Sequence, residues 1–240
     1  MLSISKMSSP SQGDYYLELA REDYYLAGGE PLGAWLGGGV ERLGLTGHVT
    51  REELHHLLEG YSADGETPLV KNAGKEDRQA GWDLTFSAPK SVSVAWSQSE
   101  GAQRIAFQEA HKTAVEKAMS YLEAEAAITR TGAGGVHRER AGLVIATFEH
   151  STSRAQDPAL HTHALVLNLG VRDDAGTGTI ESRHLYQHKM AAGALYRAEL
   201  AYQIERDPRL NLQAERKQSW FELKGISKEL KEEFKAAKGS

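Results

Sequence analysis

The sequence predicts an α+β fold in which helices cover one face of a central antiparallel β-sheet and leave the other face free. Several short segments alternate apolar and polar residues with a period of 2, which is typical of strands with one buried face. Several longer segments repeat apolar residues at the spacing of an amphipathic helix, which must pack on another surface. Antiparallel strands under long helices favour this architecture, and a free sheet face is a suitable place for a site.

Four strands are predicted, as two antiparallel pairs. The first pair is 82–87 (WDLTFS) and 91–96 (SVSVAW), separated by an Ala-Pro-Lys turn. The second pair is 142–149 (GLVIATFE) and 161–169 (HTHALVLNL). Glycine runs at 28–29, 37–39 and 132–135 predict loops.

Five helices are predicted from spacing and end signals. One begins near Ser11 or Asp14, and another has Thr50 as its N-cap and Gly60 at its C-terminal end. The predicted ranges are 14–22, 51–59, 103–127, 186–206 and 227–237. The third helix carries an apolar stripe through Phe107, Ala110, Ala114, Ala118 and Leu122 and must therefore pack on another surface.

Composition limits the chemistry. The 240 residues are 40% hydrophobic and 25% charged, which is ordinary for a globular protein, so we expect a single domain over 1–240. The chain has no cysteine, which excludes disulfides and thiolate metal sites. No apolar run approaches the roughly 20 residues of a membrane span, so we expect a cytoplasmic protein without a membrane partner. No heptad repeat appears, and we expect a monomer.

Three histidines make the strongest candidate for a site. His161 and His163 are two residues apart on a predicted strand, so their side chains share one face. His150 closes the preceding predicted strand, and pairing of the two strands would bring the three imidazoles together. Three neutral imidazoles with open positions suit a catalytic metal ion. The alternative is that an H-x-H pair merely packs; we interpret the other histidines, His111 among them, as surface or packing residues.

Asp83 and Arg154 are candidates with two interpretations each. Asp83 lies on the polar face of the first strand, where a carboxylate is usually only solvated, but a carboxylate also commonly orients a metal-bound histidine. Arg154 lies in the loop between His150 and His161, where it would bind a phosphate or remain a solvated charge.

Four tyrosines occur near the N-terminus in two pairs, Tyr15–Tyr16 and Tyr24–Tyr25. Aromatic packing is one explanation. On one continuous helix, however, positions 15 and 24 would point to opposite sides, which argues against a single buried stripe. A tyrosine beside a base or metal ion can also act as a covalent nucleophile.

Three segments together resemble one protein family. The paired tyrosines, GWDLTFSAPKSVSV at 81–94 and FEHSTSRAQDPALHTHALVLNL at 148–169 are similar to the relaxase domains of conjugative plasmid transfer proteins. These domains form the TrwC/TraI-like (MobF-type) branch of the HUH endonucleases. The resemblance runs from about residue 2 to residue 230. It implies the HUH endonuclease fold, with the metal and DNA site on the sheet face opposite the helices.

The resemblance also implies a mechanism. A tyrosine attacks a phosphodiester at the nic site of single-stranded DNA, remains on the 5′ phosphate, and allows religation. Tyr15 would be this nucleophile with Tyr16 as its neighbour or substitute, and Tyr24 or Tyr25 would perform a later strand transfer. His150, His161 and His163 would bind one divalent ion, Mg²⁺ or Mn²⁺, with Zn²⁺, Ni²⁺ or Cu²⁺ as alternatives. Asp83 would orient a histidine and help deprotonate the tyrosine.

DNA contacts and partners complete these expectations. The net charge of −5 and the absence of a basic tail mean that any DNA contact needs a folded groove, for which Arg78, Lys90 and Arg154 are candidates. The expected substrate is single-stranded or hairpin DNA at an origin of transfer, with accessory and coupling proteins of the relaxosome as partners. The chain contains no G-x-x-x-x-G-K-[ST] motif, so we expect a fragment of a longer protein without the helicase that usually follows.

Three alternatives remain open at this stage. A rolling-circle replication initiator would use the same triad and tyrosine chemistry. A metal-dependent hydrolase would use a His-bound water, with the tyrosines only packing. A non-catalytic binder of DNA hairpins would need neither metal nor nucleophile.

Overall fold

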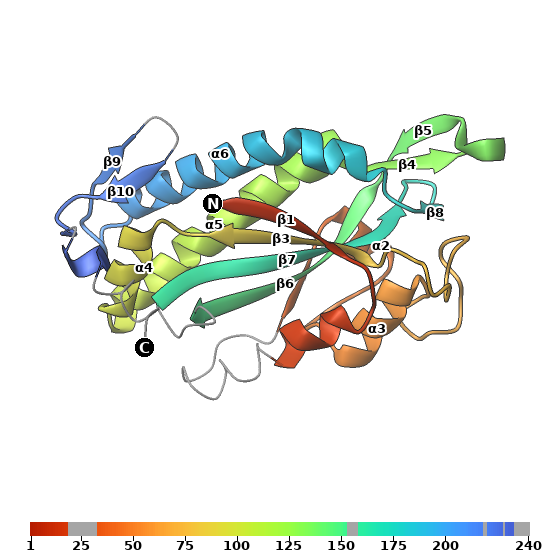
Figure 1. The fold of residues 1–240 in the computed structure, drawn as a ribbon, viewed down its shortest axis with the longest axis horizontal. Coiled ribbons are helices and arrows are strands. Elements are labelled where there is room, and N and C mark those ends of the chain that lie inside the picture. The colour runs from red at the N-terminus through yellow and green to blue at the C-terminus, as the bar shows by residue number, and fades with distance from the viewer. Residues whose placement is uncertain (19–32, 153–157, 218–219, 228, 233–240) are drawn as a thin grey trace.

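A six-stranded antiparallel sheet forms the centre of the computed structural model, which describes residues 1–18, 33–152, 158–217, 220–227 and 229–232 (Figure 1). The strand order is β1–β3–β7–β6–β2, and β8 pairs with β7. The strands are β1 (Leu2–Met7), β2 (Ala34–Leu36), β3 (Gly81–Ser87), β6 (Gly142–Thr152), β7 (Pro158–Val171) and β8 (Thr177–Gly178).

The two central strands are those that the sequence predicts most clearly. β6 and β7 are antiparallel neighbours, as expected, and both extend beyond the predicted ranges. Leu165, Val166 and Leu167 in β7 are all fully buried, because layers of side chains cover both sheet faces there. β1 was not predicted; it pairs with β3 and forms one edge of the sheet.

Three helices cover one sheet face: α4 (Lys90–Ser97), α5 (Gly101–Ala126) and α6 (Ser182–Arg206). Figure 1 shows α5 and α6 running side by side across the sheet. The core between them includes Trp82 and Phe86 from β3, Phe107 from α5 and Tyr196 from α6. This layer confirms the predicted covering of the sheet by long helices.

The opposite face is only partly free, which refines the prediction. α2 (Gly38–Arg42), α3 (Arg51–Glu59) and the helical residues 12–18 pack around a second core on this side. α3 has a capping box between Thr50 and Glu53 and ends at Gly60, whose φ of 94° favours glycine. His161 and His163, near the start of β7, keep partial exposure on this face.

Two small hairpins extend from the main sheet. One pairs β4 (Ile128–Thr131) with β5 (His137–Arg140) across the predicted loop at 132–135, and the other pairs β9 (Ala214–Arg216) with β10 (Phe221–Leu223). The glycine run at 37–39 is not simply a loop, because α2 begins at Gly38. The run at 28–29 lies outside the described residues.

The strand predicted at 91–96 is wrong, because this segment lies in helix α4. Pro89 has extended backbone angles and directly precedes the helix. The alternation of serines with apolar residues, which predicted a strand, comes from the burial of the serines. Ser91 and Ser93 are buried, where their hydroxyl groups accept hydrogen bonds from the backbone of Leu223 and Leu160 at 2.9 and 3.1 Å. The two serines therefore bond to two different segments that pack on this buried helix. β3 pairs with β1 and β7, and not with residues 91–96.

The other predicted helices are present in the described residues. The predictions at 51–59, 103–127 and 186–206 correspond to α3, α5 and α6. Residues 12–18 and 229–232 are helical, whereas the remainder of the predictions at 14–22 and 227–237 falls partly outside the described residues.

A buried polar chain crosses the helix layer behind β7. The Nε2 atom of His111 lies 2.9 Å from the hydroxyl oxygen of Thr162, and its Nδ1 atom lies 2.9 Å from that of Tyr196. His111 and Tyr196 are fully buried, and Thr162 is 5% exposed. His111 therefore packs in the core, which is one of its two interpretations from the sequence. It also bonds to Thr162, the residue between His161 and His163, and this contact was not predicted.

The buried state of His111 predicts a pH effect on stability. Burial lowers the pKa of His111 to about 3, so below pH 6.5 the unfolded chain binds a proton that the folded chain does not. The free energy of unfolding of the wild type, relative to His111→Gln, should fall by up to about 1.4 kcal/mol per pH unit between about pH 6 and pH 4. Urea unfolding of both proteins in chelator would measure it. A difference that stays constant with pH would contradict the assignment.

Candidate active site

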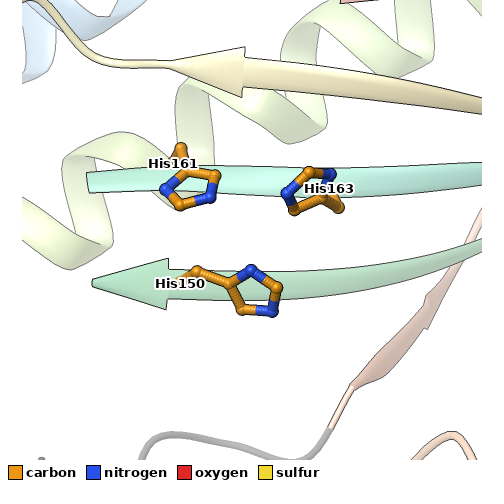
Figure 2. Close-up of side chains that lie close together, drawn as sticks. All are labelled: His150, His161 and His163. Atoms are coloured by element: carbon orange, nitrogen blue, oxygen red, sulfur yellow. The ribbon is translucent and has the colours of Figure 1, made fainter. Parts of the chain in front are cut away.

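Strand register brings the three predicted histidines together. His150 in β6 lies directly opposite His161 in β7, and His163 is the next residue of β7 on the same face. Directly paired and diagonal side chains on one sheet face are within contact distance. The ring centroids are 5.3 Å apart for His150 and His161, and His163 lies 5.1 Å from each. Figure 2 shows the three rings gathered over the ends of the two strands.

Two of the rings are oriented by hydrogen bonds of their Nδ1 atoms. Nδ1 of His163 lies 2.8 Å from Oδ2 of Asp83, and Nδ1 of His161 lies 2.7 Å from the carbonyl oxygen of Ala159. Such bonds fix the tautomer and leave Nε2 for another ligand. Asp83 reaches His163 because β3 pairs with β7 on the side away from β6.

His150 has an unusual environment. It is completely buried, and neither ring nitrogen has a hydrogen-bond partner among the described residues. Burial and the two neighbouring imidazoles lower the pKa of His150 to about 3, and burial also lowers the pKa of His161. Neutral imidazoles with free nitrogen lone pairs are what a metal ion requires.

The cluster fits a divalent metal ion. One nitrogen from each ring can be chosen so that all three lie within 4.8 Å of one another, and a metal ion would complete the missing contact of His150. Three neutral nitrogen ligands leave further coordination positions open for oxygen atoms. The site therefore combines a place for a cation with access for an anionic ligand.

A tyrosine from the N-terminal segment joins the cluster. The hydroxyl group of Tyr16 donates a hydrogen bond of 2.8 Å to Oδ2 of Asp83, and its ring lies 4.9 Å from the ring of His163. Tyr15 is 44% exposed, and its ring lies edge-on to Tyr16 at 5.3 Å. The first tyrosine pair thus lies beside the histidines, although about 150 positions separate them in sequence.

Asp83 is the centre of this arrangement. It is 5% exposed and accepts hydrogen bonds from Tyr16, His163 and the hydroxyl group of Thr85, the last at 3.3 Å. Thr85 is two residues further along β3 on the same face, and its side chain also lies 3.3 Å from Nδ1 of His163. Thr85 was not among the predicted site residues; its spacing of two residues from Asp83 on the same strand was the available signal.

The prediction that Arg78 contacts DNA is wrong. Arg78 is 2% exposed, and its guanidinium group donates to the carbonyl oxygens of Leu58 and Asn168 and to the side chain of Asn72. These bonds tie the segment before β3 to α3 and β7. Arg78 is therefore a structural residue.

The remaining candidates differ in position. Lys90 begins α4, and its amino group donates to the carbonyl oxygen of Pro158 at 3.3 Å, at the start of the strand that carries His161. Tyr24, Tyr25 and Arg154 lie outside the described residues. None of the described helices is long and apolar enough to cross a membrane.

Comparison with known proteins gives consistent matches. The family model for the TrwC relaxase matches residues 10–236. The multifunctional conjugation protein TraI of Escherichia coli K12 is 39% identical over 220 residues, and a second Escherichia coli TraI is 37% identical over 218 residues. Each alignment covers 85% of this chain but only 12% of the relative, so the chain corresponds to a small part of those proteins.

Solved structures agree. A copper-bound structure of the conjugative relaxase TrwC with oriT DNA is 32% identical and has a TM-score of 0.83, covering 98% of this chain and 80% of that one. A metal-bound TrwC–oriT complex is 33% identical with a TM-score of 0.84, covering 98% and 79%. The family model, the sequence relatives and the structural matches of the antiparallel sheet with its layer of long helices thus agree: the chain belongs to the TrwC relaxase family.

Proposed function

We propose that this chain nicks one strand of single-stranded DNA at a plasmid origin of transfer, remains attached through a 5′-phosphotyrosine, and can religate the strand. The observation that carries the proposal is the hydrogen-bonded chain from Tyr16 through Asp83 to His163, which ends on three free imidazole nitrogens. A nucleophile, a carboxylate and a cation site in contact are the parts that phosphodiester transfer needs. TrwC structures with oriT DNA, one with the recognition hairpin and the cleavage site, support this substrate.

Tyr15 is the residue that we assign to attack. Its side chain is 44% exposed, and no hydrogen bond of its hydroxyl group is found among the described residues. The hydroxyl group of Tyr16 is instead held by Asp83. Tyr16 thus holds the tyrosine pair beside the carboxylate of Asp83, and the exposed side chain of Tyr15 can reach a phosphate.

The reaction then balances as a transesterification. The phenol oxygen of Tyr15 loses its proton and forms a bond to phosphorus, the bond from phosphorus to the 3′ oxygen breaks, and the departing 3′ oxygen takes up one proton. When bound by the imidazoles, a divalent metal supplies Lewis-acid polarisation of the non-bridging phosphate oxygens. Because the phosphodiester energy is kept in the phosphotyrosine, a 3′ hydroxyl group can reverse the step.

The identity of the metal and the partners are parts of the same proposal. Mg²⁺ or Mn²⁺ is the ion used in the cell, because metal availability and not affinity alone decides which ion binds. Zn²⁺, Ni²⁺ and Cu²⁺ bind imidazole more tightly. Relaxosome accessory and coupling proteins expose the single strand, and the chain works as a monomer in the bacterial cytoplasm. Tyr24 or Tyr25 performs a second strand transfer, and Lys90 and Arg154 contact DNA.

Covalent chemistry separates this function from its alternatives. With a labelled single-stranded origin oligonucleotide and Mn²⁺, the wild type should give a denaturant-resistant protein–DNA adduct, which Tyr15→Phe should lose, because phenylalanine has no nucleophile. Tyr16→Phe, the matched control, should keep the adduct at a reduced rate. An adduct lost only in Tyr16→Phe would move the nucleophile to Tyr16, and cleavage without any adduct would indicate a hydrolase.

The histidine cluster predicts metal affinity. His150→Ala should weaken binding of Mn²⁺ or Ni²⁺ at least tenfold, measured by isothermal titration calorimetry, because it removes a third of the nitrogen ligands. His137→Ala, at an exposed position on β5, is the control and should bind as the wild type does. Equal affinity in both variants would rule out the site.

Asp83 predicts an effect through His163. Asp83→Asn should lower metal affinity about 10- to 100-fold, because the amide orients the imidazole less well than the carboxylate. The exposed Asp77→Asn is the matched control. If Asp83→Asn binds metal normally, the carboxylate does not act through His163.

A further inference from the structure

The helix layer contacts β7 differently at Thr162 than further along the strand. Thr162 lies between the two histidines of β7 but faces the helices, because side chains alternate along a strand. Ala164 and Val166, the next two residues on this face, belong to the apolar core beneath α5 and α6 (Figure 1). Apolar contacts have no preferred direction, whereas the hydroxyl group of Thr162 makes a directional contact with His111 of α5. β7 is therefore held at a defined position directly behind the histidine cluster.

His111 connects Thr162 to the second long helix. Its Nε2 atom lies 2.9 Å from the hydroxyl oxygen of Thr162, and its Nδ1 atom lies 2.9 Å from that of Tyr196 in α6. Burial lowers the pKa of His111 to about 3, so the ring is neutral and can donate from one nitrogen and accept at the other. Because a hydroxyl group can take either role, both bonds are satisfied. The three side chains thus link β7, α5 and α6.

The strands on either side of β7 are contacted from the same layer at this level. Phe86 of β3 pairs with Thr162, and its ring lies 5.3 Å from the ring of Tyr196. Glu149 of β6 pairs with Thr162 on the other side and accepts a hydrogen bond of 3.4 Å from a glutamine of α5. Glu149 directly precedes His150. The helix layer therefore supports all three strands that carry residues of the proposed site.

Stability alone does not account for this buried chain. Replacing both partners of a buried hydrogen bond by apolar groups of the same shape can be nearly neutral for folding. A fully satisfied buried polar network, in contrast, restricts a core to one arrangement. Thr162 also lines a cavity of about 260 Å³, but His111 and Tyr196 do not, so the chain does not serve a ligand in that cavity. What it can determine is the position of β7.

We infer that Thr162, His111 and Tyr196 are positioning residues, which hold the two histidines of β7 at the place that a divalent metal ion requires. They act through the backbone of β7, because the two imidazoles leave the strand on the other face, on both sides of Thr162. A shift of the strand at this point would move both imidazoles relative to His150, which comes from β6. Misplaced ligands bind a metal ion less tightly. The inference rests on the proposed function, because it takes the histidine cluster as a metal site.

The metal affinity of the folded protein tests this inference without the cleavage reaction. The two test variants, Thr162→Val and Tyr196→Phe, each remove one hydroxyl group from the chain. Each should lower the affinity for Mn²⁺ roughly three- to tenfold, measured by isothermal titration calorimetry. The double variant should lose no more affinity than the more affected single variant, because both changes break the same chain. Thr162→Ser keeps the hydroxyl group and should bind nearly as the wild type does, and this comparison with Thr162→Val stands even if Tyr196→Phe does not fold.

Two matched variants separate positioning from a loss of stability. Thr147→Val removes a hydroxyl group that donates to the backbone of Ala34 on the helix-covered face of β6, and Tyr121→Phe removes one that lies 2.9 Å from Nδ1 of His188, between α5 and α6. Both should lower the free energy of unfolding in urea with chelator, as the test variants do, but bind Mn²⁺ as the wild type does. Equal losses of affinity in the matched and the test variants would overturn the inference. So would unchanged affinity in the test variants, which would make the chain only structural.

The adduct assay keeps the two proposals apart. If the wild type binds Mn²⁺ but forms no adduct, while the test variants lose affinity as described, the proposed function fails and the positioning role stands. If adducts form and the test variants bind Mn²⁺ normally, only the positioning role fails. A wild type that binds no Mn²⁺ would overturn the positioning role as well.

Discussion

The register of β7 between β3 and β6 is the constraint on which the rest of the site depends. Antiparallel pairing places His150 opposite His161 on one side and Thr85 opposite His163 on the other. Because side chains alternate faces with a period of 2, a slip of one residue would turn the imidazoles into the helix layer. The apolar residues of β7 on both faces make such a slip costly, since they would lose their places in the two cores.

Polar groups on both sides of β7 are arranged around this register. On the site face, Asp83 accepts hydrogen bonds from a tyrosine, a histidine and a threonine, so that a nearly buried carboxylate is satisfied by its neighbours. On the helix face, Thr162 contacts His111, which in turn contacts Tyr196 of α6. Thr162, the residue between the two β7 histidines, is therefore tied directly to α5 and, through His111, to α6. Among these groups, His150 alone keeps two buried nitrogens without hydrogen-bond partners. Leaving them unpaired costs free energy, and a bound cation would remove part of this cost.

The charge distribution is consistent with local rather than general attraction of DNA. The chain is acidic overall, and many of its described arginines are paired with carboxylates, as Arg138 is with Glu181. Such pairs contribute little to attraction at a distance. Any attraction of DNA must therefore come from a local group of cations, whose reach is limited by salt screening to about 10 Å.

Sequence alone determined the parts of this protein that depend on local pattern. Period-2 alternation identified β3, β6 and β7 and the shared face of His161 and His163, and helical spacing identified α3, α5 and α6. Resemblance in long motifs identified the family and implied the roles that we propose for Asp83 and the tyrosines. The sequence could not separate α4 from a strand, because its serines are buried by contacts with β7 and β10 that come from distant parts of the chain.

Only the tertiary structure decided which side chains meet. In the tertiary structure, Arg78 is buried and bonds to carbonyl groups. Asp83 accepts a hydrogen bond from Tyr16, rather than from Tyr15. These outcomes depend on which strands become neighbours and in what register, and that is set by packing of the two cores over the whole chain rather than by any short segment.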